Sequence, residues 1–211
     1  MKTISTLAAV TACGMLTTGC FMKSSPAVAK TVSTDEFNEI VYQGSGDINI
    51  TVGEATSVNI DGAEDRVDNV TFEVEDGRLV IEEDSGLFTT GDLKIDITVS
   101  ELSYASFAGS SDAKVKGLTG EEFKLLVSGS ADVKVDGEVD TLDISVSGSS
   151  DVNAKSLTAK SVVLQVSGAS DINLAASETL NVSASGASDV TYYGEPEITK
   201  SLSGASSLDQ G

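Results

Sequence analysis

The chain has 211 residues, a formal net charge of −20, no Trp and no His. Removing an export signal over residues 1–19 leaves 12 basic and 33 acidic residues, a net charge of −21, which excludes nucleic acid as a partner because phosphates require Lys and Arg. An aromatic content of 5% indicates a thinly layered, aliphatic core within one domain of moderate size.

The N-terminus carries the features of a secretory signal. A positive charge precedes an apolar run that ends near Leu16 and is too short to span a membrane. The sequence Leu-Thr-Thr-Gly-Cys, ending at Cys20, resembles a bacterial lipobox, so we expect lipidation of Cys20. Two alternatives stay open, namely a lipobox ending at Cys13 and a small-x-small cleavage site at Ala29. With Cys20 or Ala29, the folded part contains no disulfide.

The processing site decides the expected location. Residues 20–35, rich in Ser, Ala and Lys, are expected to form a tether. Lipidation at Cys20 predicts an outer-membrane lipoprotein that faces the periplasm or the cell surface. Cleavage after Ala29 instead predicts a soluble periplasmic or secreted protein. Residues 36–211 are expected to form a single domain.

The first part of this domain carries irregular strand signals. Gly44-Ser45-Gly46-Asp47 matches a pattern repeated later in the chain, and residues 62–65 keep the same phase more weakly. Residues 70–81 alternate around Asp76-Gly77 and predict a β-hairpin. The alternating segment Leu93–Val99 is expected to form another strand that leads into the regular repeats.

The second part is a repeat of 18 to 20 residues. Its pattern is apolar-Ser-Gly-small-small-Asp-apolar, with the glycine at Gly109, Gly129, Gly148, Gly168, Gly186 and Gly204. The residues six, four and two places before the glycine are nearly always apolar, as at Leu142, Ile144 and Val146. This alternation is typical of a strand with one buried face. A second, shorter strand follows each Asp.

Each repeat is therefore one coil, which cannot bury its apolar face without a neighbour on either side. The sequence predicts an all-β fold, namely a parallel β-solenoid with an N-terminal hairpin or cap region and regular coils over residues 102–211. At about 4.8 Å per coil, the six repeats would span about 30 Å. A β-sandwich of irregular hairpins is the alternative.

The repeated Val-Ser-Gly-Ala-Ser-Asp coils, together with Tyr192-Tyr193-Gly194-Glu195-Pro196, resemble the GIN-domain family of auto-transporter adhesin head domains. The resemblance covers the chain from Phe37 onward. It implies an exported bacterial β-solenoid with an adhesive or surface-binding role and supplies no catalytic residues. Since no translocating barrel follows Gly211 in this sequence, we expect attachment through Cys20 instead of auto-transport.

The residues exclude several kinds of catalysis. Without His, and without Cys after Cys20, the domain cannot build a Ser-His-Asp triad, a Cys-His pair or an ordinary zinc site. The corner serines have no neighbouring base, so we expect them to be structural: Ser150, Ser170 and Ser188. A polysaccharide hydrolase or lyase that uses Asp or Glu is one alternative function. It is disfavoured because acidic residues recur in every coil, at Asp112, Asp132, Asp151, Asp171 and Asp189.

A calcium-binding β-roll is a second alternative. It requires a glycine-rich turn twice per coil, whereas this chain has one. We expect the Asp column to accept hydrogen bonds from its own corners, and we predict no catalytic, cofactor or metal residues. The leading hypothesis is a non-enzymatic, envelope-anchored binding module for a glycan or protein, with a solvated serine ladder on one face: Ser128, Ser147, Ser167, Ser185 and Ser203.

Overall fold

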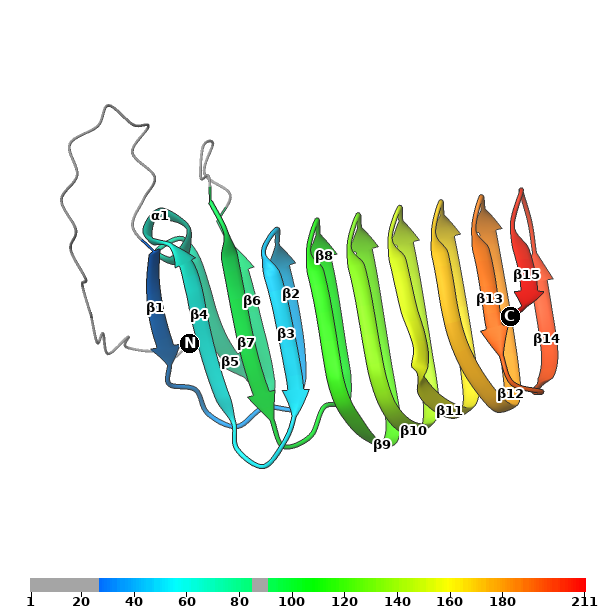
Figure 1. The fold of residues 1–211 in the computed structure, drawn as a ribbon, viewed down its shortest axis with the longest axis horizontal. Helices are drawn as coiled ribbons and strands as arrows, with labels where there is room; N and C mark the ends of the chain where they lie inside the picture. The colour runs from blue at the N-terminus through cyan, green and yellow to red at the C-terminus, as the bar shows by residue number, and fades with distance from the viewer. Residues whose placement is uncertain (1–26, 85–90) are drawn as a thin grey trace.

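The chain folds into a rod of stacked coils (Figure 1). The computed structural model describes residues 27–84 and 91–211. Apart from one short helix, the described elements are strands, and most neighbours along the rod pair in parallel. The expected all-β parallel solenoid is therefore confirmed, and its antiparallel strands gather at the N-terminal end.

Regular coils begin at β8 (Tyr104–Gly109). The long strands that follow are β9 (Asp112–Gly129), β10 (Asp132–Gly148), β11 (Asp151–Gly168) and β12 (Asp171–Gly186). The last coil consists of β13 (Asp189–Tyr193), β14 (Glu197–Leu202) and β15 (Ser207–Gln210). Each long strand bends near its middle, so that its two halves lie in two layers, and the glycine corner at its end joins it to the next strand (Figure 1).

The two outer surfaces take names from their residues. The Asp face is the outside of the layer formed by β3, the first halves of β9 to β12, β13 and β15. The Ser face is the outside of the layer formed by β2, β8, the second halves of β9 to β12, and β14.

The core consists of apolar columns that run along the rod between the two layers. Leu125, Ile144, Leu164 and Val182 occupy equivalent places in neighbouring coils and are almost completely buried. Because side chains alternate along a strand, the residues directly before and after each of these four point outward. The phase expected from the sequence is thereby confirmed.

The corner glycines are required by both space and backbone conformation. Gly148 has φ 106°, and a Cβ added there would lie 2.3 Å from the carbonyl oxygen of Gly129 in the preceding coil. Gly168 has φ 129°, and its added Cβ would lie 2.0 Å from the oxygen of Gly148. Only glycine fits such a conformation with a neighbouring backbone so close.

The sequence motif at residues 44–47 forms a true coil corner. It joins β2 (Glu39–Gly44) to β3 (Asp47–Val52), and these strands pair in parallel with β8 and β9. On their other side lie β6 (Arg78–Glu83) and β7 (Leu93–Val99). The strand expected at Leu93–Val99 is confirmed as β7, and along the chain it leads into β8, where the regular coils begin. In space, β3 lies between β7 and β9.

The weaker copy expected at residues 62–65 is wrong. β4 (Ser57–Ala63) runs antiparallel to β7, and the helix α1 (Glu64–Val67) follows it in place of a corner. Gly62 serves close packing, because a Cβ there would lie 2.4 Å from the carbonyl oxygen of Asp92. The glycine therefore marks a close approach of two strands and not a turn.

The predicted hairpin is confirmed. β5 (Val70–Glu75) pairs antiparallel with β6. The turn residues Asp76 and Gly77 have positive φ angles of 51° and 78°, as a two-residue hairpin loop requires.

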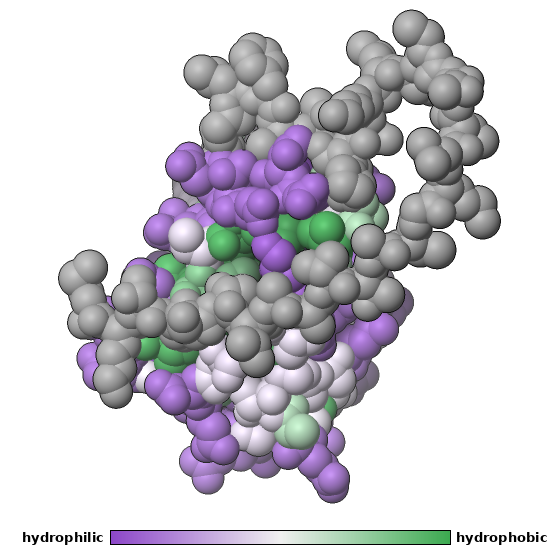
Figure 2. All heavy atoms as spheres, turned by 90° about the vertical axis from the view of Figure 1, so that its left-hand side faces the viewer, coloured by the Kyte–Doolittle hydropathy of each residue, from purple (hydrophilic) through white to green (hydrophobic). Residues whose placement is uncertain are grey.

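The first described strand, β1 (Ala27–Val32), pairs antiparallel with β4. The segment expected to be a tether, residues 20–35, therefore contains a strand of the folded domain. Its alternating pattern explains this, because Val28 and Val32 pack against the core. Figure 2 shows the N-terminal end, where apolar surface is visible between hydrophilic side chains.

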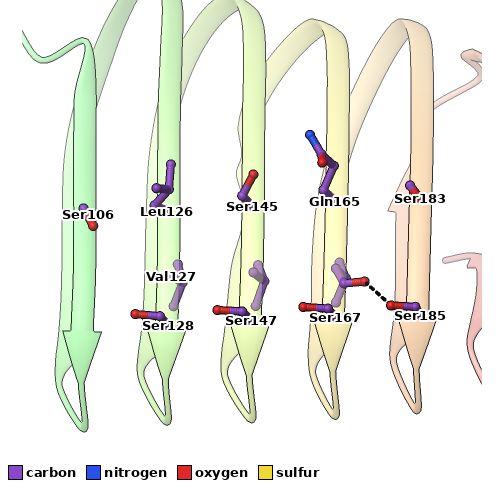
Figure 3. A pocket seen from close by; sticks show the side chains of 12 residues that line it. Ser106, Leu126, Val127, Ser128, Ser145, Ser147, Gln165, Ser167, Ser183 and Ser185 are labelled. Atoms are coloured by element: carbon purple, nitrogen blue, oxygen red, sulfur yellow. Dashed lines mark hydrogen bonds between the residues drawn. The ribbon is translucent and has the colours of Figure 1, made fainter.

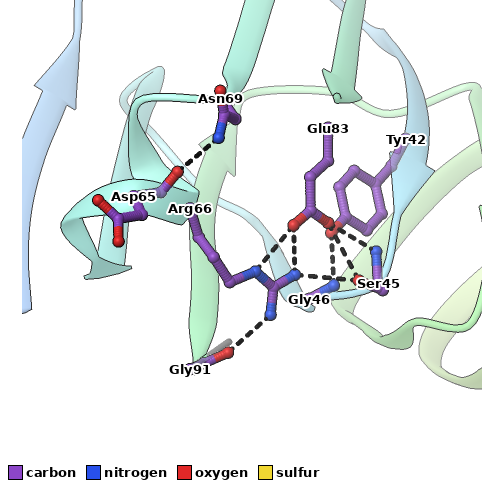
Figure 4. Close-up of polar contacts among 8 residues, drawn as sticks. All are labelled: Tyr42, Ser45, Gly46, Asp65, Arg66, Asn69, Glu83 and Gly91. Atoms are coloured by element: carbon purple, nitrogen blue, oxygen red, sulfur yellow. Dashed lines mark hydrogen bonds and ion pairs between the residues drawn. The ribbon is translucent and has the colours of Figure 1, made fainter. Parts of the chain in front are cut away.

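A buried ion pair attaches the N-terminal cap to the coils (Figure 4). Arg66 of α1 donates from Nε to Glu83 Oε1 at 2.8 Å and from a terminal nitrogen to Ser45 Oγ at 3.0 Å. Beside it, Tyr42 Oη accepts the Gly46 N–H at 2.8 Å. Burial raises the pKa of Tyr42 to about 12. In the described ranges, no helix is both long enough and apolar enough to cross a membrane.

Candidate functional site

A shallow serine-lined groove on the Ser face is the candidate binding surface (Figure 3). It extends across β8 to β12 and has a volume of about 420 Å³. One column of its lining lies directly before the corner glycines and consists of Ser128, Ser147, Ser167 and Ser185. The other column lies two residues earlier and consists of Ser106, Leu126, Ser145, Gln165 and Ser183. The groove exists because most of these outward positions carry serine, whose side chain is small.

The hydroxyl groups of the first column are spaced by the coil repeat, about 4.8 Å. Ser185 Oγ donates to the carbonyl oxygen of Val166 at 3.4 Å. The hydroxyls of Ser128, Ser147 and Ser167 make no hydrogen bond within the described part of the chain. Since no charged side chain lines the groove, it offers neutral donors and acceptors at regular intervals, which suits a ligand with many hydroxyl groups.

An ion pair lies beside the groove. Lys124 and Asp143 face each other in register on β9 and β10, and their charged atoms are 3.5 Å apart. The second carboxylate oxygen, Asp143 Oδ1, is buried and has no hydrogen-bond partner among the described residues. On each strand, the charged residue of this pair is the one nearest to the second column of the groove. It stands two residues before Leu126 on β9 and two residues before Ser145 on β10.

The corner serines have the structural role expected for them. Ser150, Ser170 and Ser188 are buried. Their Oγ atoms donate to carbonyl oxygens in the preceding coil, at distances of 3.3, 3.4 and 3.3 Å. The Ser150 hydroxyl also accepts the Ala131 N–H at 3.2 Å. These hydroxyl groups are therefore committed to holding coils together.

The Asp column stacks in register on the Asp face, as the repeat predicts. The carboxylates do not cap their own corners as expected. Asp151 Oδ1 lies 3.4 Å from the Asp171 N–H, and Asp189 Oδ1 accepts from Ser207 Oγ at 2.9 Å, both in the following coil. Corner N–H groups are already used, because Ser149 and Asp151 donate them to the preceding coil. Within the described ranges, no three Asp, Glu, Cys or His side chains are grouped to hold a metal ion.

Cys20, the predicted lipidation residue, lies outside the described residues. Sequence reasoning missed a second polar surface on the Asp face, where Lys114, Lys116 and Lys134 surround a hollow. The sequence did contain a signal for this surface, because Lys114 and Lys134 both stand five residues after a corner glycine. Register between the coils then places them side by side.

The chain resembles one protein family and several solved structures. The family model described as "Putative auto-transporter adhesin, head GIN domain" matches residues 36–196. A "putative adhesin" from Bacteroides fragilis is 26% identical, with a TM-score of 0.72 over 89% of this chain and 98% of that chain. No curated protein matches the chain.

Two structures from Parabacteroides distasonis share the fold at lower identity. One is described as a "putative adhesin", with 16% identity and a TM-score of 0.56 over 89% of this chain and 98% of that chain. The other is described as a "Putative lipid binding protein", with 19% identity and a TM-score of 0.57 over 88% of this chain and 96% of that chain.

Proposed function

The chain belongs to the head GIN domain family of auto-transporter adhesins, and from this premise we propose that it is a non-enzymatic binding module of the cell envelope whose ligand lies in the serine-lined groove. The single observation that carries the proposal is the ladder of unpaired hydroxyls on a rigid, uncharged surface. The likeness to the Bacteroides fragilis protein supports the adhesive role.

A glycan chain is the ligand class that fits this groove. Its hydroxyl groups can both donate to and accept from serine hydroxyls and from the Gln165 amide. Each such hydrogen bond contributes only about 0.5–1.5 kcal/mol, so useful affinity requires several coils to act together. A groove that continues across β8 to β12 provides those repeated contacts along an extended polymer.

The lining supports binding without catalysis. Glycoside hydrolysis requires two carboxyl groups on either side of the bond that is cleaved, and the groove lining contains no Asp or Glu. Asp143 lies at its edge, where it is paired with Lys124. A polysaccharide enzyme that acts in this groove is therefore the weaker alternative.

We further propose that lipidation at Cys20 anchors the domain as an outer-membrane lipoprotein. Support comes from β1, since cleavage after Ala29 would remove three of the six residue pairs that join β1 to β4. Cleavage before Cys20 leaves that strand intact. Radiolabelled palmitate should be incorporated into the native protein and not into Cys20→Ser; equal labelling of the two would contradict the assignment.

The groove is tested by obstructing it. We expect the protein to bind a subset of glycans on an array, and Ser147→Gln with Ser167→Gln to weaken that binding by about tenfold, because the longer side chains fill the groove and displace several hydrogen bonds. The matched control is Thr119→Gln with Thr158→Gln, at exposed positions outside the lining. Unchanged binding in the groove variant, or binding to proteins and to no glycan, would refute the proposal.

A further inference from the structure

Three lysines on the Asp face have no partner although the chain is strongly acidic. Most cations of the described part are paired with a carboxylate: Lys30, Arg66, Arg78, Lys94, Lys124 and Lys160. Lys155 lies 3.8 Å from the ring centre of Tyr193. Within that part, the side chains of Lys114, Lys116, Lys134 and the distant Lys200 make no ion pair, hydrogen bond or ring contact. Three of the four unpaired cations therefore lie together.

The three lysines lie beside one another on two neighbouring strands. Lys114 and Lys134 are directly opposite each other on the parallel strands β9 and β10, and like charges in that position destabilise a sheet. With Lys116 they line a hollow of about 220 Å³, which we call the lysine hollow. Asp136 is the one carboxylate of its lining, and its Oδ1 accepts the Gly117 N–H at 2.9 Å. This carboxylate therefore has a backbone partner, and within the described residues it makes no ion pair with the three lysines.

A second hollow of opposite charge adjoins the first. It has a volume of about 300 Å³, and Asp132, Asp151 and Asp171 contribute its carboxylates; we call it the carboxylate hollow. Both hollows share Lys134 and Asn153 in their linings, so they lie side by side on the Asp face.

Two features set the geometry across the pair of hollows. Asp132 and Lys134 are two residues apart on one strand, a separation of about 7 Å. Asn153 Oδ1 accepts the Lys155 N–H at 3.3 Å, which leaves the amide NH₂ group free to donate to a ligand.

We propose that these two hollows form a binding site for phosphoethanolamine, with the phosphate in the lysine hollow and the ammonium group in the carboxylate hollow. A single small zwitterion matches both charges at once. A polyphosphate would place its second anionic group near Asp132 and Asp151, where it is repelled. A simple amine would leave the lysines uncompensated. The site lies on the opposite layer from the serine-lined groove and does not depend on the function proposed for that groove.

The first test is calorimetric titration of the full chain carrying Cys20→Ser with O-phosphoethanolamine, inorganic phosphate and ethanolamine. Saturable binding of O-phosphoethanolamine is expected, about tenfold tighter than that of phosphate, because two charge-assisted contacts replace one. Lys114→Gln with Lys134→Gln should abolish it. Lys200→Gln, which removes an equally unpaired lysine elsewhere, should leave it unchanged.

A second pair of substitutions tests the ammonium position. Asp132→Asn with Asp151→Asn should weaken the binding of O-phosphoethanolamine by about tenfold and should not weaken the binding of inorganic phosphate. Absence of saturable binding, or equal affinity for phosphate and O-phosphoethanolamine in the native protein, would overturn the proposal. An equal effect of Lys200→Gln and the lysine double variant would also overturn it.

Vesicle sedimentation then distinguishes the sources of the group. If the phosphoethanolamine belongs to a lipid headgroup, the same protein should sediment with vesicles containing phosphatidylethanolamine and not with phosphatidylglycerol vesicles, and the lysine double variant should stay in solution. Binding of O-phosphoethanolamine without vesicle binding supports a soluble or glycan-borne source. Preferential sedimentation with phosphatidylglycerol would overturn the zwitterion site, since it would show that negative charge alone is recognised.

Discussion

Ser150 Oγ donates a hydrogen bond at 3.3 Å to the carbonyl oxygen of Gly129 in the preceding coil. The same hydroxyl accepts the N–H of Ala131 at 3.2 Å. One buried side chain therefore satisfies two backbone groups and joins the corner between β10 and β11 to the corner between β9 and β10. Replacing it leaves the Ala131 N–H buried without an acceptor.

Ser150→Ala should lower the free energy of unfolding by about 1–3 kcal/mol, the usual cost of a buried polar group left unsatisfied. Ser149→Ala is the matched control, since Ser149 is exposed in the same corner. Urea unfolding monitored by circular dichroism gives both values. Similar losses for the two variants would show that the hydroxyl is not what holds the corner.

The phase of the coils is tested at two adjacent residues of β11. Leu164 is completely buried between Ile144 and Val182, whereas Gln165 is exposed. Leu164→Ala should cost about 2–5 kcal/mol through lost burial and the cavity it leaves. Gln165→Ala should change the free energy of unfolding by less than about 0.5 kcal/mol. The reverse order would contradict the register.

The regular coils could be read from the sequence because their signal is local and repeated. The column through Leu164 follows from alternation and from a constant distance to the corner glycine. The neighbours of β3 could not be read in this way. The spacing of the sequence repeats does not show that Ile48 lies between Ala113 of β9 and Ile95 of β7. That order of strands depends on how the N-terminal cap folds back.

The sites were predictable only in part, for the same reason. The serine ladder was visible as a repeated residue, but the groove also requires Leu126 and Gln165 in register across coils. In the lysine hollow, Asp136 accepts a hydrogen bond from the Gly117 N–H, a contact that only coordinates can show. Arg66 was missed because a four-residue helix has no periodic signal.

The ion pair of Arg66 and Glu83 should matter more than any surface pair. Both side chains are nearly inaccessible, at 9% and 3% exposure. Arg66→Met leaves a buried carboxylate without its partner and should cost about 3–5 kcal/mol.

The control for this pair is Arg78→Met. It removes an exposed cation that pairs with Glu39 and should cost about 0–1 kcal/mol. Thermal unfolding of the two variants makes the comparison, and equal shifts in Tm would contradict the role assigned to the cap.

Tyr42 should make the fold sensitive to alkali. Its pKa is raised from 10.0 to about 12, chiefly by burial. The unfolded chain therefore releases this proton first, so the stabilising effect is complete below pH 10 and is lost as pH rises toward 12. The free energy of unfolding should fall across this window. Tyr42→Phe cannot ionise and should show a shallower fall, whereas an identical slope would exclude Tyr42 as the cause.

The last coil carries a charge where the core column would otherwise continue. Lys200 pairs with Val182 in register and is exposed on β14. In the described chain, β14 pairs only with β12, so its other edge is unpaired. Lysine at the edge of a sheet discourages pairing with another chain.

Lys200→Val should therefore promote end-to-end association of the rod. Burying part of the new side chain contributes about 1.5 kcal/mol, or about tenfold in the association constant. Ser201→Val adds the same side chain at the adjacent outward position and should have little effect. Sedimentation velocity over a concentration series gives both constants. If Ser201→Val associates as strongly as Lys200→Val, added hydrophobicity is the cause and Lys200 has no special role at this edge.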